Sequence, residues 1–197
     1  KPGEESTLPG GIPDYAKRGA EALKHAGEDK PELSKPAPVK ISSLASGIKG
    51  RGLAAIMKNP EDLMRQGKFT LSLDQYDQAE QVAPNNPFIE LGRANAELGA
   101  LYYARAEAHL REVFAAHPET LMGQYDLSKW LGDDRLQVLV RDLKEIAVKN
   151  PTEARPLFLL AYIAYNTGHA ETAAAYIALA DKRSDGKDPF YKLLRDN

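Results

Sequence analysis

Four histidines are the residues of this 197-residue sequence whose chemistry would best suit acid–base catalysis or metal binding. They are His25, His109, His117 and His169, and no two of them are three or four residues apart. A separation of three or four residues would place two metal ligands on one face of a helix. The sequence contains no cysteine, so disulfides, thiolate nucleophiles and thiolate metal ligands are all excluded. We therefore expect no metal site and no cofactor.

Adjacent carboxylates are the next candidates for chemistry, at Glu61-Asp62 and Asp133-Asp134. Neighbouring side chains point to different faces of a helix, so these pairs do not converge on one substrate atom. Their positions near expected helix starts instead favour capping, because carboxylates stabilise the first turn. The glycine-rich basic segment at residues 47–52 lacks the spacing and the hydroxyl residue of a phosphate-binding loop, and it indicates a hinge before the first helix. The residues thus predict no enzyme.

Composition and charge narrow the possible partners. The chain is 43% hydrophobic with a formal charge of −2, so no basic field would hold nucleic acid. The longest apolar run, Leu157 to Tyr165, is nine residues, and a membrane span needs about 20. We expect no membrane insertion of this chain. The first residue is Lys1, which indicates a processed or excised chain, and both a cytoplasmic and a cell-envelope or secreted location are compatible with the sequence.

Residues 1–52 differ from the rest of the chain in composition. They contain six of the 13 prolines and eight of the 15 glycines, which disfavour long helices. One short helix is predicted over residues 15–25. The rest is expected to be an arm, either a tether or a segment packed on the domain, with Pro31 to Pro38 as a candidate for packing. The arm has nine basic and seven acidic residues, and the remainder has 17 basic and 21 acidic, so their charges attract weakly.

Residues 53–197 repeat with a period of about 34 residues. Prolines at 84, 118 and 151 are spaced by 34 and 33 residues, and each interval holds two apolar stretches with helical spacing. A glycine stands between the stretches, where it would permit a tight turn between paired helices. No stretch alternates with period two, so no strand is predicted. The four turn glycines are Gly67, Gly99, Gly132 and Gly168.

Several residues within this period resemble the tetratricopeptide-repeat family. Phe88, Leu91 and Gly92 match the large apolar residue, leucine and glycine of the family's first helix, and Ala106 and Leu110 match its second. The family's tyrosine is replaced by Asn95, which we expect to weaken packing there. The resemblance implies an all-α, right-handed α-solenoid of about four helix–turn–helix units over residues 53–197.

The other units match less completely. In the first unit Tyr76 and Ala79 fit the second helix, whereas Asn59-Pro60 predicts a late start for a short first helix. The third unit is the most degenerate and carries two extra residues around Gly132. Asp188-Pro189 predicts a capping helix from Phe190 to Arg195.

Tetratricopeptide domains bind peptides or partner helices on a concave surface formed by the first helix of each unit. The resemblance therefore implies a protein-binding groove with aromatic and mixed-charge side chains. We expect Tyr162 and Tyr165 to be partly exposed, whereas for Trp130 a place in the core is equally favoured. The predicted groove residues are Arg93, Glu97, Asp126, Lys129, Trp130, Arg155, Tyr162, Tyr165 and Asn166.

Two functions from different classes follow. The first is a non-enzymatic protein–protein interaction module, a scaffold or adaptor that binds an extended peptide or helix in the groove. The alternative is a structural or oligomerisation domain whose own N-terminal arm packs along the solenoid. The expected partner is a protein or peptide, whose identity and stoichiometry the sequence leaves open.

Overall fold

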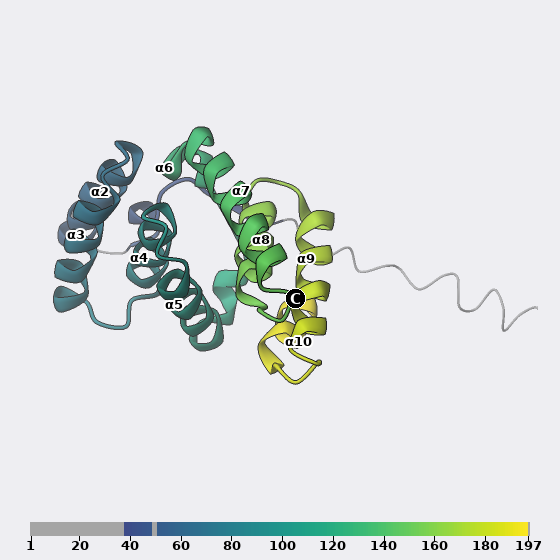
Figure 1. Ribbon diagram of the computed structural model, residues 1–197. Coiled ribbons are helices and arrows are strands. Elements are labelled where there is room, and N and C mark those ends of the chain that lie inside the picture. The colour runs from purple at the N-terminus through teal and green to yellow at the C-terminus, as the bar shows by residue number, and fades with distance from the viewer. Residues whose placement is uncertain (1–37, 49–50, 197) are drawn as a thin grey trace, which may run out of the picture. The chain divides into compact units, whose positions relative to one another are not determined.

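Helices make up most of the described chain, which comprises residues 38–48 and 51–196 of a computed structural model (Figure 1). Within these residues there are nine α-helices and two strands of three residues each. The predicted all-α class is therefore confirmed, while the helix expected over residues 15–25 lies outside the described part. The α-helices are α2 (Arg51–Arg65), α3 (Phe69–Val82), α4 (Pro87–Gly99), α5 (Tyr103–Ala116), α6 (Leu127–Leu131), α7 (Asp133–Lys149), α8 (Arg155–Asn166), α9 (Ala170–Arg183) and α10 (Pro189–Asp196).

Consecutive helices pack as pairs, with α2 on α3, α4 on α5 and α8 on α9 (Figure 1). Gly67 and Gly168 lie in the turns of the first and last pair with φ of 72° and 83°, and Gly132 joins α6 to α7 with φ of 81°. A positive φ suits glycine because it has no Cβ. Gly99 also lies at its predicted bend, but it ends α4, and the positive φ of that turn (67°) falls on Leu101.

Two glycines of α4 serve close packing rather than a turn. A Cβ on Gly92 would lie 2.3 Å from the ring of Tyr76 on α3, and a Cβ on Gly99 would lie 2.5 Å from the ring of Phe69. The absence of side chains on α4 therefore lets the two aromatic rings of α3 lie against its backbone. Burial of Tyr76, which is fully enclosed, stabilises the contact between the first two helix pairs.

The first helix is longer than predicted. The Asn59-Pro60 pair was expected to start it, but α2 begins at Arg51 and continues through Pro60. Proline removes one helical hydrogen bond and usually disfavours such a position. Here Met57, Pro60 and Met64 share one face of α2 and are all buried, so apolar burial offsets that loss. The Ser72 hydroxyl of α3 donates to the Pro60 carbonyl at 2.9 Å.

The segment at 118–131 departs most from the repeat pattern. The 3-10 helix η2 (Pro118–Met122) and the strand β2 (Gly123–Tyr125) stand where a repeat's first helix was expected, and α6 adds only five residues. The absence of strands predicted from the sequence is thus wrong for the described chain. Strand β1 (Val39–Ile41) pairs with β2 in parallel, so distant main-chain partners replace helical hydrogen bonds.

The last helix, α10, confirms the predicted capping helix after Asp188-Pro189. It packs on α9, and its residues Phe190 and Tyr191 are buried. Arg111 of α5 stacks 4.5 Å from the centre of the Phe190 ring and pairs with Asp188 at 2.7 Å. A planar guanidinium can make both contacts together, so this arginine connects the end of the chain to the second helix pair.

The described residues all belong to one compact unit, which begins at Pro38. The predicted domain begins at residue 53, so the unit includes 15 residues of the expected arm. None of the helices in the described part is long and apolar enough to cross a bilayer.

Candidate binding site

Residues 38–48, which we call the strap, lie on the helical body as an extended segment. Val39, Lys40 and Ile41 of the strap are aligned with Gly123, Gln124 and Tyr125 of β2, respectively. The pairing continues past the strands, because the Asp126 main-chain N–H donates to the Ile41 carbonyl at 3.0 Å. The indole N–H of Trp130 donates to the Ser42 carbonyl at 3.2 Å. Main-chain hydrogen bonds therefore hold the first half of the strap.

A buried carboxylate holds the second half of the strap. Glu61 of α2 is only 1% exposed, and its Oε1 accepts from the Ala45 main-chain N–H at 3.0 Å and from the Ser43 hydroxyl at 3.2 Å. Its Oε2 pairs with Arg65 at 3.2 Å, which compensates the charge. A buried carboxylate is costly unless it is paired and hydrogen-bonded, and here the strap supplies two of the three partners.

Apolar side chains anchor the strap between these polar contacts. Leu44 is fully buried in the core, and Ile41, which is half-buried, packs against the same core. Gly123 makes room for Ile41, since a Cβ there would lie 2.9 Å from Ile41 Cδ1. We call Glu61, β2 and Trp130 the acceptor site, because together they contact both the main chain and the side chains of the strap.

Helix α8 holds the strand β2 of the acceptor site in place through hydrogen bonds. The Asn166 Oδ1 accepts from the Tyr125 main-chain N–H at 2.6 Å, and Gln124 Nε2 donates to the Tyr165 carbonyl at 2.9 Å. The Asn166 amide N–H2 donates to the Tyr162 carbonyl, which orients its oxygen toward β2. Asn166 and Tyr165, both predicted as groove residues, are therefore brought together here, with Asn166 buried and Tyr165 partly exposed.

Tyr162 corrects one expectation. It was expected to be partly exposed, but it is only 6% exposed and packs 6.1 Å from Phe114, centre to centre. Its hydroxyl donates to Asn95 Oδ1 at 3.0 Å. Burial raises the pKa of Tyr162 well above its ordinary value, so it is a neutral hydrogen-bond donor. Asn95 was expected to weaken packing, and instead it connects α4 to α8 through this bond.

Trp130 belongs to the core, which was one of the two places that the sequence favoured equally for it. It is fully buried and lies 6.1 Å from the Tyr125 ring, centre to centre, so only its indole N–H serves the acceptor site. Asp126 caps α6 by accepting from the Lys129 main-chain N–H at 3.1 Å, and the Lys129 side chain is exposed. These three predicted groove residues thus differ in burial although they lie within five positions.

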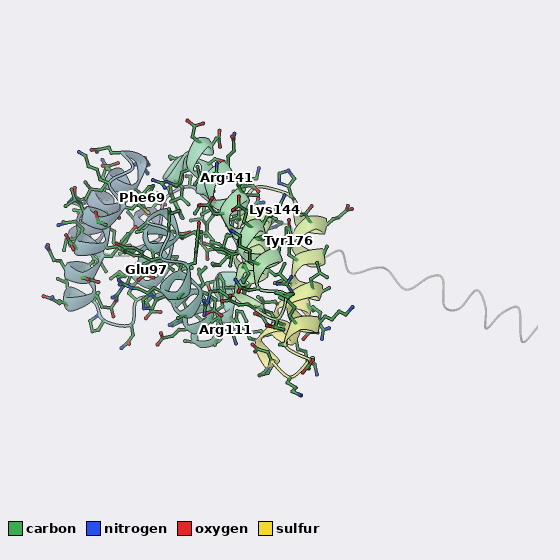
Figure 2. All side chains as sticks on the ribbon, viewed as in Figure 1. Phe69, Glu97, Arg111, Arg141, Lys144 and Tyr176 are labelled. Atoms are coloured by element: carbon green, nitrogen blue, oxygen red, sulfur yellow. The ribbon has the colours of Figure 1, made fainter. Side chains whose placement is uncertain are left out.

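Arg93 and Glu97 belong to a separate cluster on the second helix pair. Glu97 is fully buried, and its two oxygens lie 2.9 Å from Arg105 and 2.6 Å from His109 Nδ1 (Figure 2). Arg93 lies 4.0 Å from Glu97 and 3.2 Å from Asp77. Arg93 of α4 and Arg105 of α5 thus lie beside this carboxylate, an arrangement that joins these helices and compensates its charge.

The remaining predicted groove residue, Arg155, lies away from the strap. It begins α8 and pairs with Glu153 at 2.7 Å and with Glu107 of α5 at 3.8 Å. Its side chain is 41% exposed, so these pairs add little to stability. The predicted groove residues therefore fall into three places. Asp126 and Trp130 bond to the strap itself, and Tyr165 and Asn166 bond to the strand β2 that pairs with it.

A cleft of about 780 Å³ lies between the α2–α3 turn and the start of α7. Arg135 of α7 stacks 5.0 Å from the centre of the Phe69 ring, and both residues line the cleft together with Asp133 and Asp134 (Figure 2 labels Phe69). The sequence did not predict this cleft, because its walls come from turns about 65 residues apart. In the described part of the chain, no three acidic or histidine side chains converge as metal ligands.

Sequence reasoning missed the residues that hold the strap most directly. Glu61 was taken only as a helix-start carboxylate, and Gly123 and Ser42 were not singled out. The one available signal was the proline- and glycine-rich composition of the arm, which favours extended chain. It does not identify the strand with which that chain pairs.

Comparison of the sequence with models of known protein families finds no match, and comparison with curated proteins finds no relative. A function for this chain is therefore inferred from its strap, its acceptor site and its helix pattern.

Proposed function

We propose that this chain is a non-enzymatic interaction module, similar to tetratricopeptide-repeat proteins, that binds an extended peptide at the acceptor site. The period of about 34 residues supports the repeat assignment, as do the turn glycines. The close approach of Gly92 to Tyr76 is a further argument, because small residues at such positions let neighbouring helix pairs pack tightly. A scaffold or adaptor role follows if the peptide belongs to another protein.

One observation carries the proposal: the chain's own strap is bound as an extended peptide would be. A peptide that adds to a sheet edge gains affinity from main-chain hydrogen bonds and specificity from pockets for some of its side chains. The strap has both, with strand pairing to β2 and the buried Leu44. The acceptor site has therefore the chemistry of a peptide-binding surface, whatever segment occupies it.

Binding of a synthetic peptide tests this function. A fluorescent peptide of residues 38–48 is titrated into the full chain carrying Leu44→Ala, and into the unsubstituted chain. Removing the leucine side chain costs the strap about 2–5 kcal/mol. The substituted chain should therefore release its own strap more often and bind the peptide at least about tenfold more tightly.

A second peptide, in which Leu44 is replaced by aspartate, is the matched control and should not bind. Circular dichroism establishes that the Leu44→Ala chain is folded at the temperature of the titration. If that folded chain binds neither peptide, or binds both equally, the acceptor site is not a peptide-binding surface and the proposal is wrong.

The structural alternative is favoured by the same strap contacts. If the strap never leaves, it is simply part of the fold, and the acceptor site serves stability. Limited proteolysis distinguishes the two, with Lys40 as the trypsin-sensitive position. A cleavage rate at Lys40 that equals the rate of global unfolding supports the structural role, whereas faster cleavage supports a strap that opens locally.

A further inference from the structure

We propose that the strap of one copy occupies the acceptor site of a second copy, which produces a dimer with reciprocally exchanged straps. This inference rests on the proposed peptide-binding function and names a second copy of this chain as the occupant. The strap of a second copy is the one occupant whose fit the structure itself demonstrates, residue by residue.

Every contact that holds the strap can be made between copies without change. The strap is joined to the body by the pairing of β1 with β2, by the hydrogen bond from Trp130 to Ser42 and by the two hydrogen bonds to Glu61. None of these contacts is made by the residues that connect the strap to α2. Exchange of an identical element therefore conserves these interactions, and only the connection between strap and body differs.

Only two residues separate the strap from α2. The strap ends at Ile48 and α2 begins at Arg51, while Glu61, which binds the strap, lies ten residues further along α2. The strap therefore folds back beside its own first helix. Short connections of this kind favour exchange of the segment that precedes them.

Reciprocal exchange gives a symmetric contact, because each copy donates one strap and accepts one. In the closed monomer the strap is held at an effective concentration in the millimolar range. Dilute chain is therefore expected to be mainly monomeric, and exchange becomes competitive as the chain concentration approaches that range. The dimer is also expected to persist after dilution, since its return requires both straps to leave.

Crosslinking between two differently substituted full-length chains tests the exchange. The native sequence has no cysteine, so single cysteines report cleanly. One chain carries Lys40→Cys in the strap and the other carries Gln124→Cys in β2, and these residues are aligned in the sheet. The chains are mixed at about millimolar concentration until the yield is constant, then treated with a short thiol crosslinker. A crosslinked heterodimer on a denaturing gel is the expected product.

The same third substitution on either chain then provides the decisive control. In a reciprocal exchange, Leu44→Ala weakens its strap equally in the closed monomer and in the dimer, so it should change the final heterodimer yield little and to the same extent on either chain. The substituted strap should leave its own acceptor site more often, so the final yield should be reached sooner. If instead one chain only donates its strap, the yield should fall with Leu44→Ala on the Lys40→Cys chain and rise with Leu44→Ala on the Gln124→Cys chain.

A further mixture replaces Lys40→Cys by Lys192→Cys, on the exposed surface of α10, and measures random collision. We expect about tenfold more heterodimer from the aligned pair than from this control. Equal yields from the aligned pair and the control, or opposite effects of Leu44→Ala on the two chains, would overturn the reciprocal exchange. If the synthetic peptide still binds in that case, the peptide-binding function stands and only the exchange fails.

Discussion

The helix pairs and the segment at 118–131 differ in where their main-chain groups find hydrogen-bond partners. In the pairs α2–α3, α4–α5 and α8–α9, main-chain groups are satisfied within each helix and apolar faces pack on the next helix along the chain. In the segment at 118–131 the helix is interrupted, and the main-chain N–H groups of Tyr125 and Asp126 donate to the Asn166 side chain and to the Ile41 carbonyl, which lie 41 and about 85 residues away. An interruption of helical structure thus leaves a strand edge that an extended peptide can use.

The comparison predicts that damage to the irregular segment releases the strap, whereas damage to the helix pairs does not. Trp130→Ala should give the largest effect, because it empties a fully buried site in the core and removes the bond to Ser42. We expect a loss of about 3–5 kcal/mol in the free energy of unfolding, measured by urea denaturation. Tryptic cleavage at Lys40 should also accelerate beyond the rate that global unfolding accounts for.

Trp130→Phe keeps most of the ring and removes the indole N–H. It should cost less stability while still accelerating cleavage at Lys40. Unchanged cleavage in both variants would show that the strap does not depend on this contact.

Gly92→Ala tests the helix pairs, and its effect should be the next largest. The new Cβ would lie 2.3 Å from the enclosed Tyr76 ring, so either the ring or the two helices must shift. Overpacking of this kind lowers the free energy of unfolding by about 1–3 kcal/mol. Once this loss is allowed for, tryptic cleavage of the strap should be no faster than in the parent chain. Gly52→Ala is the matched control: nothing lies within 4 Å of a Cβ there, and it should stabilise by about 0.4–1 kcal/mol. A neutral Gly92→Ala would contradict the close packing of α3 on α4.

Tyr162→Phe removes the hydroxyl that bonds to Asn95 and leaves the buried amide oxygen without that donor. We expect a loss of about 1–3 kcal/mol at the lower end of that range, because the aromatic ring remains in place. Combining it with Asn95→Leu in a double-mutant cycle should recover part of the loss, since both polar groups are then removed. Strictly additive effects in that cycle would show that the bond does not couple α4 to α8.

Glu90→Gln should have the smallest effect, and its sign depends on pH. Burial, together with repulsion from Glu80 and Glu112, raises the pKa of the Glu90 carboxyl above 4.5, while His117 and His109 oppose the shift. The folded state therefore binds this proton more tightly than the unfolded state, and stability falls as the pH rises from 4.5 through the raised pKa. The variant should melt higher than the parent at neutral pH and no higher below pH 4.5. A constant difference at both pH values would exclude this origin.

The sequence predicted the helical parts well because their cause is local. Gly67, Gly132 and Gly168 lie in turns with positive φ, and Asp188-Pro189 starts the last helix, as expected from backbone preferences alone. The predicted start of α2 was wrong, since burial of Pro60 on an apolar face outweighs its helix-breaking character. Of the predicted groove residues, Trp130 belongs to the acceptor site, and Asn166 and Tyr165 bond to its strand. Tyr162 instead bonds to Asn95, and Glu97 lies in another cluster.

The sequence by itself determined the helical class and the turns at Gly67, Gly132 and Gly168, because these depend on residues a few positions apart. Only the tertiary structure decided that residues 38–48 pair with β2 and that Glu61 binds them. Three-residue strands carry almost no periodic signal, and their partner is chosen by which main-chain groups the helices leave unsatisfied. That choice depends on the packing of the whole body, which no local pattern contains.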